Sequence, residues 1–373
     1  MCVKVLAIAR HIFVNIISLL LLAYGKKAGS NTIAYKTIRH TFHKFMKGGR
    51  LLFVKLDLTE RCNGNCEYCY SERRDIEPSL GEIEKFFSQL KGRLCGIDLM
   101  GGEPMLREDI NEIIKAAKKI GKIFRVRMFT NGTLIDRKSA INLKNNGLGV
   151  AFVSFYSNVA SLQDSVSGYD GTFEKKITAI KELVRAGIKT YTFTVLNKKN
   201  VNQITSIRTL IRELGASPVF SNQIPINNEI SSIQLTPKEV YGVKESLGKN
   251  SKAHMTMVNN MFEFAERVCF GGYYLLSIKV DGAVTHCPFI YDIALGNAFK
   301  EDIFEIFKRR FSVKAFRDAY GIPAECLPCV FVKYCKGGCR AGNADYSKKS
   351  FSCQGPWQDV EFGKMSYCIS HWF

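Results

Sequence analysis

The sequence lacks acidic residues at its start: the first 50 residues include no Asp or Glu, and Asp57 is the first acid. The same stretch carries nine Lys or Arg residues, nearly half of the net charge of +19. Such a segment suits a negatively charged surface, either an anionic membrane or a nucleic acid. No nucleic-acid motif accompanies the charge, which disfavours a nucleic-acid partner.

Long apolar runs are also absent. The most apolar run covers residues 12–24, well short of the roughly 20 residues that a bilayer requires. A helix packed on the rest of the fold and a helix lying in the membrane surface both stay open. The basic residues between Lys36 and Arg50 favour the second, because anionic lipid attracts such segments. A secretory signal and an organelle transit peptide also match the pattern.

A clear signal-peptide cleavage site, internal repeats and low-complexity segments are missing too. The first absence matters because the chain holds 13 cysteines, a number typical of secreted disulfide scaffolds. Those scaffolds are short, whereas this chain has 373 residues and is 46% hydrophobic, enough to bury a core. We therefore expect a cytoplasmic protein, peripheral at the inner face of the membrane if its leader binds lipid.

Most of the cysteines fall into two arrays with short spacings. The first is a C-x3-C-x2-C triplet formed by Cys62, Cys66 and Cys69. The second comprises seven cysteines: Cys269, Cys287, Cys326, Cys329, Cys335, Cys339 and Cys353. Thiolates so close in sequence can enclose one inorganic cluster, and three of them leave one iron of a four-iron cluster open for chemistry. Zinc is the alternative for the second array, but it would not explain the triplet.

The first array resembles the signature of the radical S-adenosylmethionine (SAM) enzymes, with aromatic Tyr68 before its last cysteine. The second array, with Gly282 after its first cysteine, resembles the SPASM extension of one branch of that superfamily. Together the two patterns cover residues 52–353. The resemblance implies SAM, one [4Fe–4S] cluster at the triplet and two auxiliary iron–sulfur clusters.

Apolar periodicity predicts strands that alternate with helices. The predicted strands are residues 51–59, 95–100, 124–130, 150–156, 190–196 and 217–223, and the predicted helices are 81–91, 108–120, 136–146, 172–186 and 201–214. This alternation implies parallel strands with right-handed crossovers, and six units are too few for a closed barrel. The expected fold is α/β: a partial (β/α)6 TIM-like barrel, which the resemblance also implies, followed by a cysteine-rich SPASM domain with a short β-hairpin and helices.

Four segments are expected along the chain. Residues 1–50 form the basic leader, 51–235 the barrel, 236–258 a polar linker helix and 259–373 the SPASM domain. Within the last segment, residues 274–287 are typical of a hairpin that turns at Asp281-Gly282.

Segments at three predicted strand ends resemble the SAM-binding parts of the family. Met100 is followed by Gly101, Gly102, Glu103 and Pro104, where the resemblance assigns Glu103 and backbone carbonyls to the SAM amino group. Asn131 lies in a Thr-Asn-Gly turn, and Ser154 matches a position that touches the SAM ribose or carboxylate. Relatives often read Ser-x-Asp there, whereas this chain has Ser154-Phe155-Tyr156. Tyr156 is open between core packing and a substrate contact.

By position, the resemblance divides the later cysteines between two auxiliary clusters. Cys269, Cys287 and Cys339 would hold the first, and Cys326, Cys329, Cys335 and Cys353 the second. The family often has a further cysteine shortly before the position of Cys269, but residues 260–268 contain none. An open iron, a different ligand such as Cys368 or a two-iron cluster would each account for this.

Two departures concern the substrate. Cys287 is followed by Pro288, where sulfatase-maturing relatives carry a catalytic Asp, so formylglycine formation is disfavoured. The 50 residues before the first strand cannot hold the leader-binding domain of many peptide-modifying relatives, so a peptide precursor would need a separate recognition partner. His286 could titrate near neutrality, although an isolated histidine on a strand is more often structural.

The predicted function is reductive cleavage of SAM to a 5′-deoxyadenosyl radical that abstracts hydrogen from the substrate, with flavodoxin or ferredoxin as reductant. Peptide or protein maturation is the favoured role. A membrane-surface enzyme that modifies a lipid, a tetrapyrrole or another small metabolite is the first alternative. A metal-stabilised binding protein without catalysis is the second.

Overall fold

The computed structural model describes residues 51–222 except for 68, 70, 72 and 73, and then 233–236, 239, 271–272, 275–329, 332, 337–341 and 348. The basic leader and nearly all of the predicted linker helix therefore lie outside the described residues. None of the helices within the described ranges has the length and apolar character needed to cross a bilayer.

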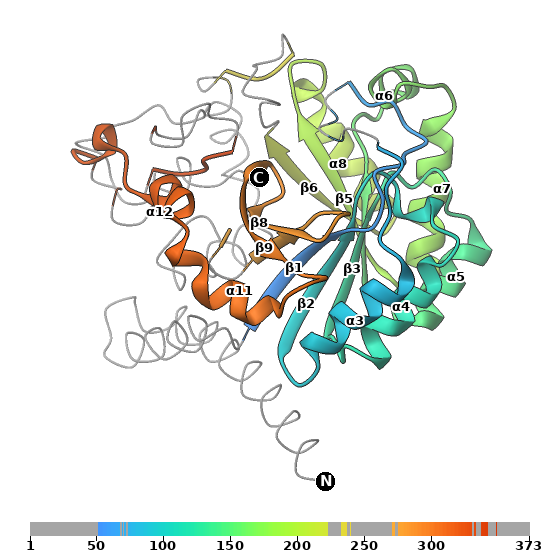
Figure 1. The fold of residues 1–373 in the computed structure, drawn as a ribbon. Coiled ribbons are helices and arrows are strands. Elements are labelled where there is room, and N and C mark those ends of the chain that lie inside the picture. The colour runs from blue at the N-terminus through green and yellow to red at the C-terminus, as the bar shows by residue number, and fades with distance from the viewer. Residues whose placement is uncertain are drawn as a thin grey trace, which may run out of the picture.

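The described chain is organised around one nine-stranded sheet with the order β6-β5-β4-β3-β2-β1-β7-β8-β9 (Figure 1). Its first six strands are all parallel, as predicted. They are β1 (Leu51–Asp57), β2 (Leu94–Met100), β3 (Arg125–Thr130), β4 (Val150–Ser154), β5 (Lys189–Leu196) and β6 (Ser217–Asn222). The sheet is open, with β6 and β9 as its edge strands, so the expectation of an open barrel is confirmed.

Helices follow the strands and cover one side of the sheet (Figure 1). They are α3 (Leu80–Leu90), α4 (Ile110–Lys119), α5 (Arg137–Asn146), α6 (Ala160–Ser167), α7 (Thr172–Arg185) and α8 (Ile204–Glu213). Single 3-10 turns occur at η1 (Pro104–Leu106) and η2 (Val201–Gln203). Five of these six helices were predicted, and α6 is the one that the sequence pattern did not reveal.

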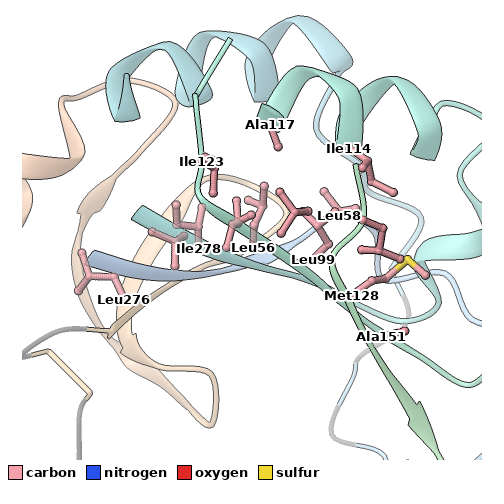
Figure 2. Close-up of a cluster of buried hydrophobic side chains, with 14 of the residues drawn as sticks. Leu56, Leu58, Leu99, Ile114, Ala117, Ile123, Met128, Ala151, Leu276 and Ile278 are labelled. Carbon is pink, nitrogen blue, oxygen red and sulfur yellow. The ribbon is translucent and has the colours of Figure 1, made fainter. Parts of the chain in front are cut away.

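The main core lies between the strands and these helices (Figure 2). Alternate residues of β1 turn toward the helices, and Leu52, Val54 and Leu56 are almost completely buried there. Phe86 and Phe87 of α3 fill the same layer. Because strand side chains alternate between faces, the remaining residues of each strand line the inner side of the open barrel.

That inner side carries aromatic and basic residues. Phe129 stacks on Phe152 with ring centroids 4.5 Å apart, and Phe152 stacks on Tyr191 at 5.0 Å. Lys55 lies over the ring of Phe129 at 5.8 Å, and Arg127 lies over that of Phe152 at 5.6 Å. Arg127 is also paired with Asp98, with Nη2 2.7 Å from Oδ2, so the inner wall combines an aromatic stack with Lys55 and an Arg127–Asp98 ion pair.

The C-terminal part continues the barrel sheet. β7 (Leu275–Ile278) pairs in parallel with β1, and β8 (Ala283–Cys287) pairs with β7 as an antiparallel hairpin, as predicted. The sequence did not reveal β9 (Ile290–Asn297), whose ladder with β8 contains register shifts. The helices that follow are α11 (Ile303–Arg309), η3 (Arg310–Ser312), α12 (Lys314–Tyr320) and η4 (Ala324–Cys326).

The hairpin turn has no room for a side chain at Gly282. Its φ is +83°, and a Cβ there would lie 2.5 Å from both Asn297 Oδ1 and Phe299 Cδ2. The backbone of the turn is also tied down, since Gly282 N donates to Lys279 O at 2.9 Å and Ala298 N donates to Gly282 O at 2.8 Å. Glycine at this position is therefore a requirement of the turn that ends in Cys287.

We expect Gly282→Ala to lower the free energy of unfolding by about 2–4 kcal/mol, combining left-handed strain with overpacking. Two alanine controls separate these causes. Gly171 has a φ of +75° with nothing within 4 Å, and Gly81 has neither positive φ nor a close neighbour. Gly171→Ala should cost about 1–2 kcal/mol, and Gly81→Ala should be neutral or stabilising. Urea unfolding followed by circular dichroism measures all three, and equal effects at Gly282 and Gly171 would contradict the steric part.

Candidate active site

The cysteine triplet lies in the loop that follows β1. Cys62, Cys66 and Cys69 are each half-buried and free of disulfides. A Cβ built at Gly64 would lie 3.6 Å from Cys62 Sγ and 3.8 Å from Cys66 Sγ, so both sulfur atoms flank the same point of the loop. Gly64 N donates to Cys62 Sγ at 3.3 Å. Tyr68, the predicted aromatic neighbour, lies outside the described residues.

Helix α6 supports this loop from the side. Asn65 N donates to Ser167 O at 2.9 Å. The next residue, Gly168, ends α6 with a φ of +83°, and a Cβ there would lie 2.3 Å from the carbonyl oxygen of Asn65. The element missed by the sequence analysis therefore fixes the backbone between the first two cysteines.

The donor set of the triplet fits an iron–sulfur cluster. Burial raises the pKa of Cys62 most, the Gly64 amide lowers it, and the nearby charges of Glu103, Cys66 and Cys69 raise it further. Thiolates that repel one another need bound positive charge, which iron supplies. Among the described side chains, no three His, Cys, Asp or Glu residues close around a single ion. Three thiols match a four-iron cluster with one open iron, whereas a structural zinc site takes four protein ligands.

Two glycines bring the loop after β2 against the triplet loop. A Cβ at Gly101 would lie 2.2 Å from Thr59 O, and one at Gly102 would lie 2.2 Å from Arg61 O. The loops are hydrogen-bonded as well, because Gly102 N donates to Thr59 O at 2.7 Å and Glu103 N donates to Arg61 O at 2.8 Å. Only glycine permits backbones to approach this closely.

Glu103 joins this loop to the turn after β3. Its carboxylate is fully buried and accepts three hydrogen bonds: from Thr130 Oγ1 at 2.7 Å, Asn131 N at 2.6 Å and Met105 N at 3.0 Å. Burial raises the pKa of Glu103, while these donors, with the more distant charge of Lys176, lower it. Pro104, the last residue of the predicted segment, begins η1 and is buried. The sequence predicted the turn that contains Thr130 and named Asn131 as its binding residue, whereas the bond of Thr130 to Glu103 comes from the structure.

Asn131 links the turn back to the first cysteine. Its Nδ2 donates to Asn63 Oδ1 at 2.8 Å and lies 4.0 Å from Cys62 Sγ. Asn63 Nδ2 in turn donates to Thr133 Oγ1 at 3.0 Å. The structure therefore brings together the predicted residues that follow β1, β2 and β3, at the end of the sheet where these parallel strands terminate.

The end of β4 contributes Ser154 and Tyr156. The side chain of Ser154 lies on the inner side of the strand, and its carbonyl accepts a hydrogen bond from Lys176 Nζ at 3.0 Å. Tyr156 Oη lies 3.8 Å from Cys66 Sγ, and Lys176 Nζ lies 4.5 Å above the Tyr156 ring. Burial lowers the pKa of Lys176 to about 8, although the nearby charges of Cys66 and Glu103 raise it. The sequence analysis did not identify Lys176, which stands on the buried face of α7.

Four of the auxiliary cysteines belong to the described residues: Cys287, Cys326, Cys329 and Cys339. Cys287 ends β8 and is half-buried. Cys326 and Cys329 share one tight turn, in which Cys329 N donates to Cys326 O at 3.0 Å. Cys339 is half-buried, while Cys269, Cys335, Cys353 and Cys368 lie outside the described residues. The division of these cysteines between two clusters stays a prediction.

A buried ion pair lies near both the triplet and Cys287. Lys279 Nζ is 3.5 Å from Asp57 Oδ2, donates to Pro288 O at 3.0 Å and lies 3.7 Å over the ring of Tyr291. Burial raises the pKa of Asp57, and the charge of Lys279 opposes this rise. The pKa of Tyr291 is raised, first by burial and then by charges that include Asp57 and Cys287.

His286 is a buried structural residue and does not titrate near neutrality. Its ring is fully buried, with its centroid 5.2 Å from that of Phe316 and 5.1 Å from that of Tyr320. Neither ring nitrogen has a hydrogen-bond partner among the described residues. Burial therefore lowers the pKa of His286 to about 4.

Comparison with known proteins agrees with this arrangement. Residues 56–211 match the family model of the radical SAM superfamily, and residues 269–340 match that of the SPASM iron–sulfur cluster-binding domain. The chain is 29% identical over 292 residues to a probable GTP 3′,8-cyclase of Sulfurisphaera tokodaii, covering 72% of this chain and 90% of that protein. It is 24% identical over 350 residues to an AdoMet-dependent heme synthase of Methanosarcina barkeri, covering 85% and 95%.

Solved structures share the fold at lower identity. SuiB of Streptococcus suis bound to SAM superimposes with a TM-score of 0.66 at 18% identity, covering 93% of this chain and 89% of that one. The enzyme anSMEcpe with bound AdoMet gives 0.66 at 20% identity, covering 81% and 94%. The two family models match this chain, and the triplet and the strand-end loops around it agree with them. This chain therefore belongs to the radical SAM superfamily and carries a SPASM iron–sulfur cluster-binding domain.

Proposed function

We propose that this enzyme cleaves SAM reductively at a cluster held by Cys62, Cys66 and Cys69 and abstracts hydrogen from its substrate. The observation that carries the proposal is the Glu103 carboxylate, which fastens the loop after β2 and the turn after β3 beside the triplet. SAM bound at the open iron would supply a carbon radical on one-electron reduction. Flavodoxin or ferredoxin is the class of reductant that we expect.

The residues of this chain would bind and orient SAM. Gly101 and Gly102 let their loop lie directly against the triplet loop, which would place its backbone carbonyls beside SAM at the cluster. Glu103 already receives one hydrogen bond at Oε2, and a carboxylate oxygen has a second acceptor position for the SAM ammonium group. Ser154 faces the inner side of the barrel, where the SAM ribose or carboxylate would lie.

The auxiliary site would hold two further clusters, on the ligand sets predicted from the sequence. The shared turn of Cys326 and Cys329 supports a common cluster for these two thiols. Cys287 belongs to a different element, strand β8, and its charge acts on Lys279 of the Asp57–Lys279 pair, which agrees with a separate cluster. The first of these clusters has three cysteine ligands in the prediction, so an iron with another ligand, an open iron or a two-iron cluster remains part of this proposal.

We propose that the enzyme acts in the maturation of a peptide or protein substrate. SuiB has been solved with its precursor peptide SuiA, and anSMEcpe with the peptide Cp18Cys. A PqqA peptide cyclase of Rhodopseudomonas palustris is 24% identical over 312 residues, covering 78% of this chain and 82% of that protein. These proteins support the proposal through their shared fold and their sequence similarity to this chain.

A tetrapyrrole substrate is the second candidate, and the inner wall of the barrel favours it. The stacked rings of Phe129, Phe152 and Tyr191 offer an apolar surface, and Lys55 lies beside it. An aromatic surface beside a lysine suits a planar ligand that carries a carboxylate. The similarity to AdoMet-dependent heme synthases points to the same ligand class.

The triplet is tested by Cys62→Ala, with Cys95→Ala as the matched control. Cys95 is fully buried in β2, outside both arrays, and burial raises its pKa to about 12. We expect Cys62→Ala to lose about four irons per chain and all SAM-dependent 5′-deoxyadenosine. Cys95→Ala should keep both. Iron and sulfide analysis with an anaerobic 5′-deoxyadenosine assay measures this, and stoichiometric zinc without product would favour the binding-protein alternative.

The Glu103 contacts are tested by Thr130→Val, which removes one donor and leaves a buried carboxylate less well satisfied. The cost of about 1–3 kcal/mol predicts a SAM dissociation constant raised by about tenfold, with the iron content unchanged. Thr190→Val is the control, because buried Thr190 donates only to Ile188 O, at the opposite end of the sheet. Equilibrium dialysis under anaerobic conditions measures binding, and equal constants for the two variants would contradict the role of Glu103.

The two substrate classes are separated by an absorbance titration with coproporphyrin. If the inner wall binds a tetrapyrrole, Lys55→Gln should weaken binding by about tenfold, because a charge-assisted hydrogen bond is worth about 1.5–3 kcal/mol. Lys189→Gln is the control, since Lys189 lies over Tyr191 at 5.3 Å but is exposed at the start of β5. Coproporphyrin that does not bind the wild type would remove this candidate and leave peptide maturation.

A further inference from the structure

Tyr156 stands at a position where its hydroxyl meets a ligand of the radical cluster. Its Oη lies 3.8 Å from Cys66 Sγ. A cluster-bound thiolate carries no proton, so the tyrosine hydroxyl must be the donor in the loaded enzyme.

The backbone of Tyr156 is held in place by two side chains. Tyr156 N donates to Gln163 Oε1 at 2.8 Å, and Asn200 Nδ2 donates to Tyr156 O at 3.0 Å. Gln163 and Asn200 are themselves fully buried. Core packing alone would need only a phenylalanine ring, whereas this arrangement directs a hydroxyl at one chosen sulfur.

Lys176 adds a buried positive charge behind the ring. It is 1% exposed, lies 4.5 Å over the Tyr156 ring and donates to the carbonyl of Ser154. Within the described part of the chain it forms no ion pair with a carboxylate at contact distance, and the negative groups that raise its pKa are Cys66 first, then Glu103, Asp164 and Cys62. A buried cation without a carboxylate partner is costly, so its retention here requires negative charge nearby.

We propose that Tyr156 and Lys176 are a positioning pair that raises the reduction potential of the triplet cluster by stabilising the charge on the Cys66 thiolate. This inference rests on the proposed function, because it assumes a redox cluster at the triplet. Reduction adds one electron, supplied by the low-potential reductant, to a site that is already negative. A hydrogen bond to a cluster sulfur and a nearby cation both favour the more negative state.

The test is a redox titration of the anaerobically reconstituted enzyme, followed by electron paramagnetic resonance with and without SAM. The SAM-dependent part of the spectrum isolates the triplet cluster from the auxiliary clusters. We expect Tyr156→Phe and Lys176→Met to shift its midpoint to more negative potential, with iron content unchanged. Lys118→Met is the control, because Lys118 donates to Ile123 O at 2.9 Å, at the end of the sheet opposite the triplet.

A second measurement needs no variant. The Tyr156 hydroxyl proton should appear as an exchangeable proton coupled to the reduced cluster by electron–nuclear double resonance, and it should vanish in deuterated water. Its absence in the wild type, or equal midpoints for wild type, Tyr156→Phe and Lys176→Met, would overturn the pair. The proposed function would survive that result if 5′-deoxyadenosine still depends on Cys62.

Discussion

The arrangement of the site depends on one buried carboxylate. Glu103 has no exposed surface, so each of its oxygens must be satisfied within the protein, and its donors come from the turn after β3 and from its own loop. The adjacent glycines press the same loop against the backbone that leads into Cys62. The loops that follow β1, β2 and β3 are therefore held in fixed relative positions before any ligand binds. A cofactor site requires this kind of preorganisation.

The strands and most helices could be predicted because their burial is apolar and periodic. Helix α6 could not, because its buried face is polar: Gln163 bonds the backbone of Tyr156 and the hydroxyl of Ser167 at 2.8 Å each. Strand β9 was not predicted for a related reason, since register shifts in its ladder with β8 interrupt the alternation of its buried and exposed residues. The cysteine spacing, the Gly101–Glu103 segment and the turn at Asn131 predicted the candidate site, but Lys176 is recognisable only once the fold brings it there. Local patterns report local burial, whereas these contacts join distant elements.

The continuity of the sheet explains how the auxiliary region meets the barrel. β7 joins β1 in parallel, with Phe53 beside Leu275, so the hairpin that carries Cys287 extends from the same strand that leads to the triplet. The ion pair of Asp57 and Lys279 spans the two strands at this junction. A hydrogen-bonded ladder is stiffer than a contact between separate domains, so the spacing between the two cysteine regions is set by the sheet and not by a linker.

The two buried lysines follow one electrostatic principle. Lys176 lies behind the triplet and Lys279 lies beside Cys287, and burial lowers the pKa of both while neighbouring negative groups oppose that fall. Thiolate-bound clusters carry net negative charge in a region from which water must be excluded for radical chemistry. Water cannot then screen that charge, so the protein has to supply cations at fixed positions. Lys279 already has the Asp57 carboxylate as a partner, whereas Lys176 has none within hydrogen-bond distance among the described residues, so a cluster at the triplet would offset more of the cost of burying Lys176.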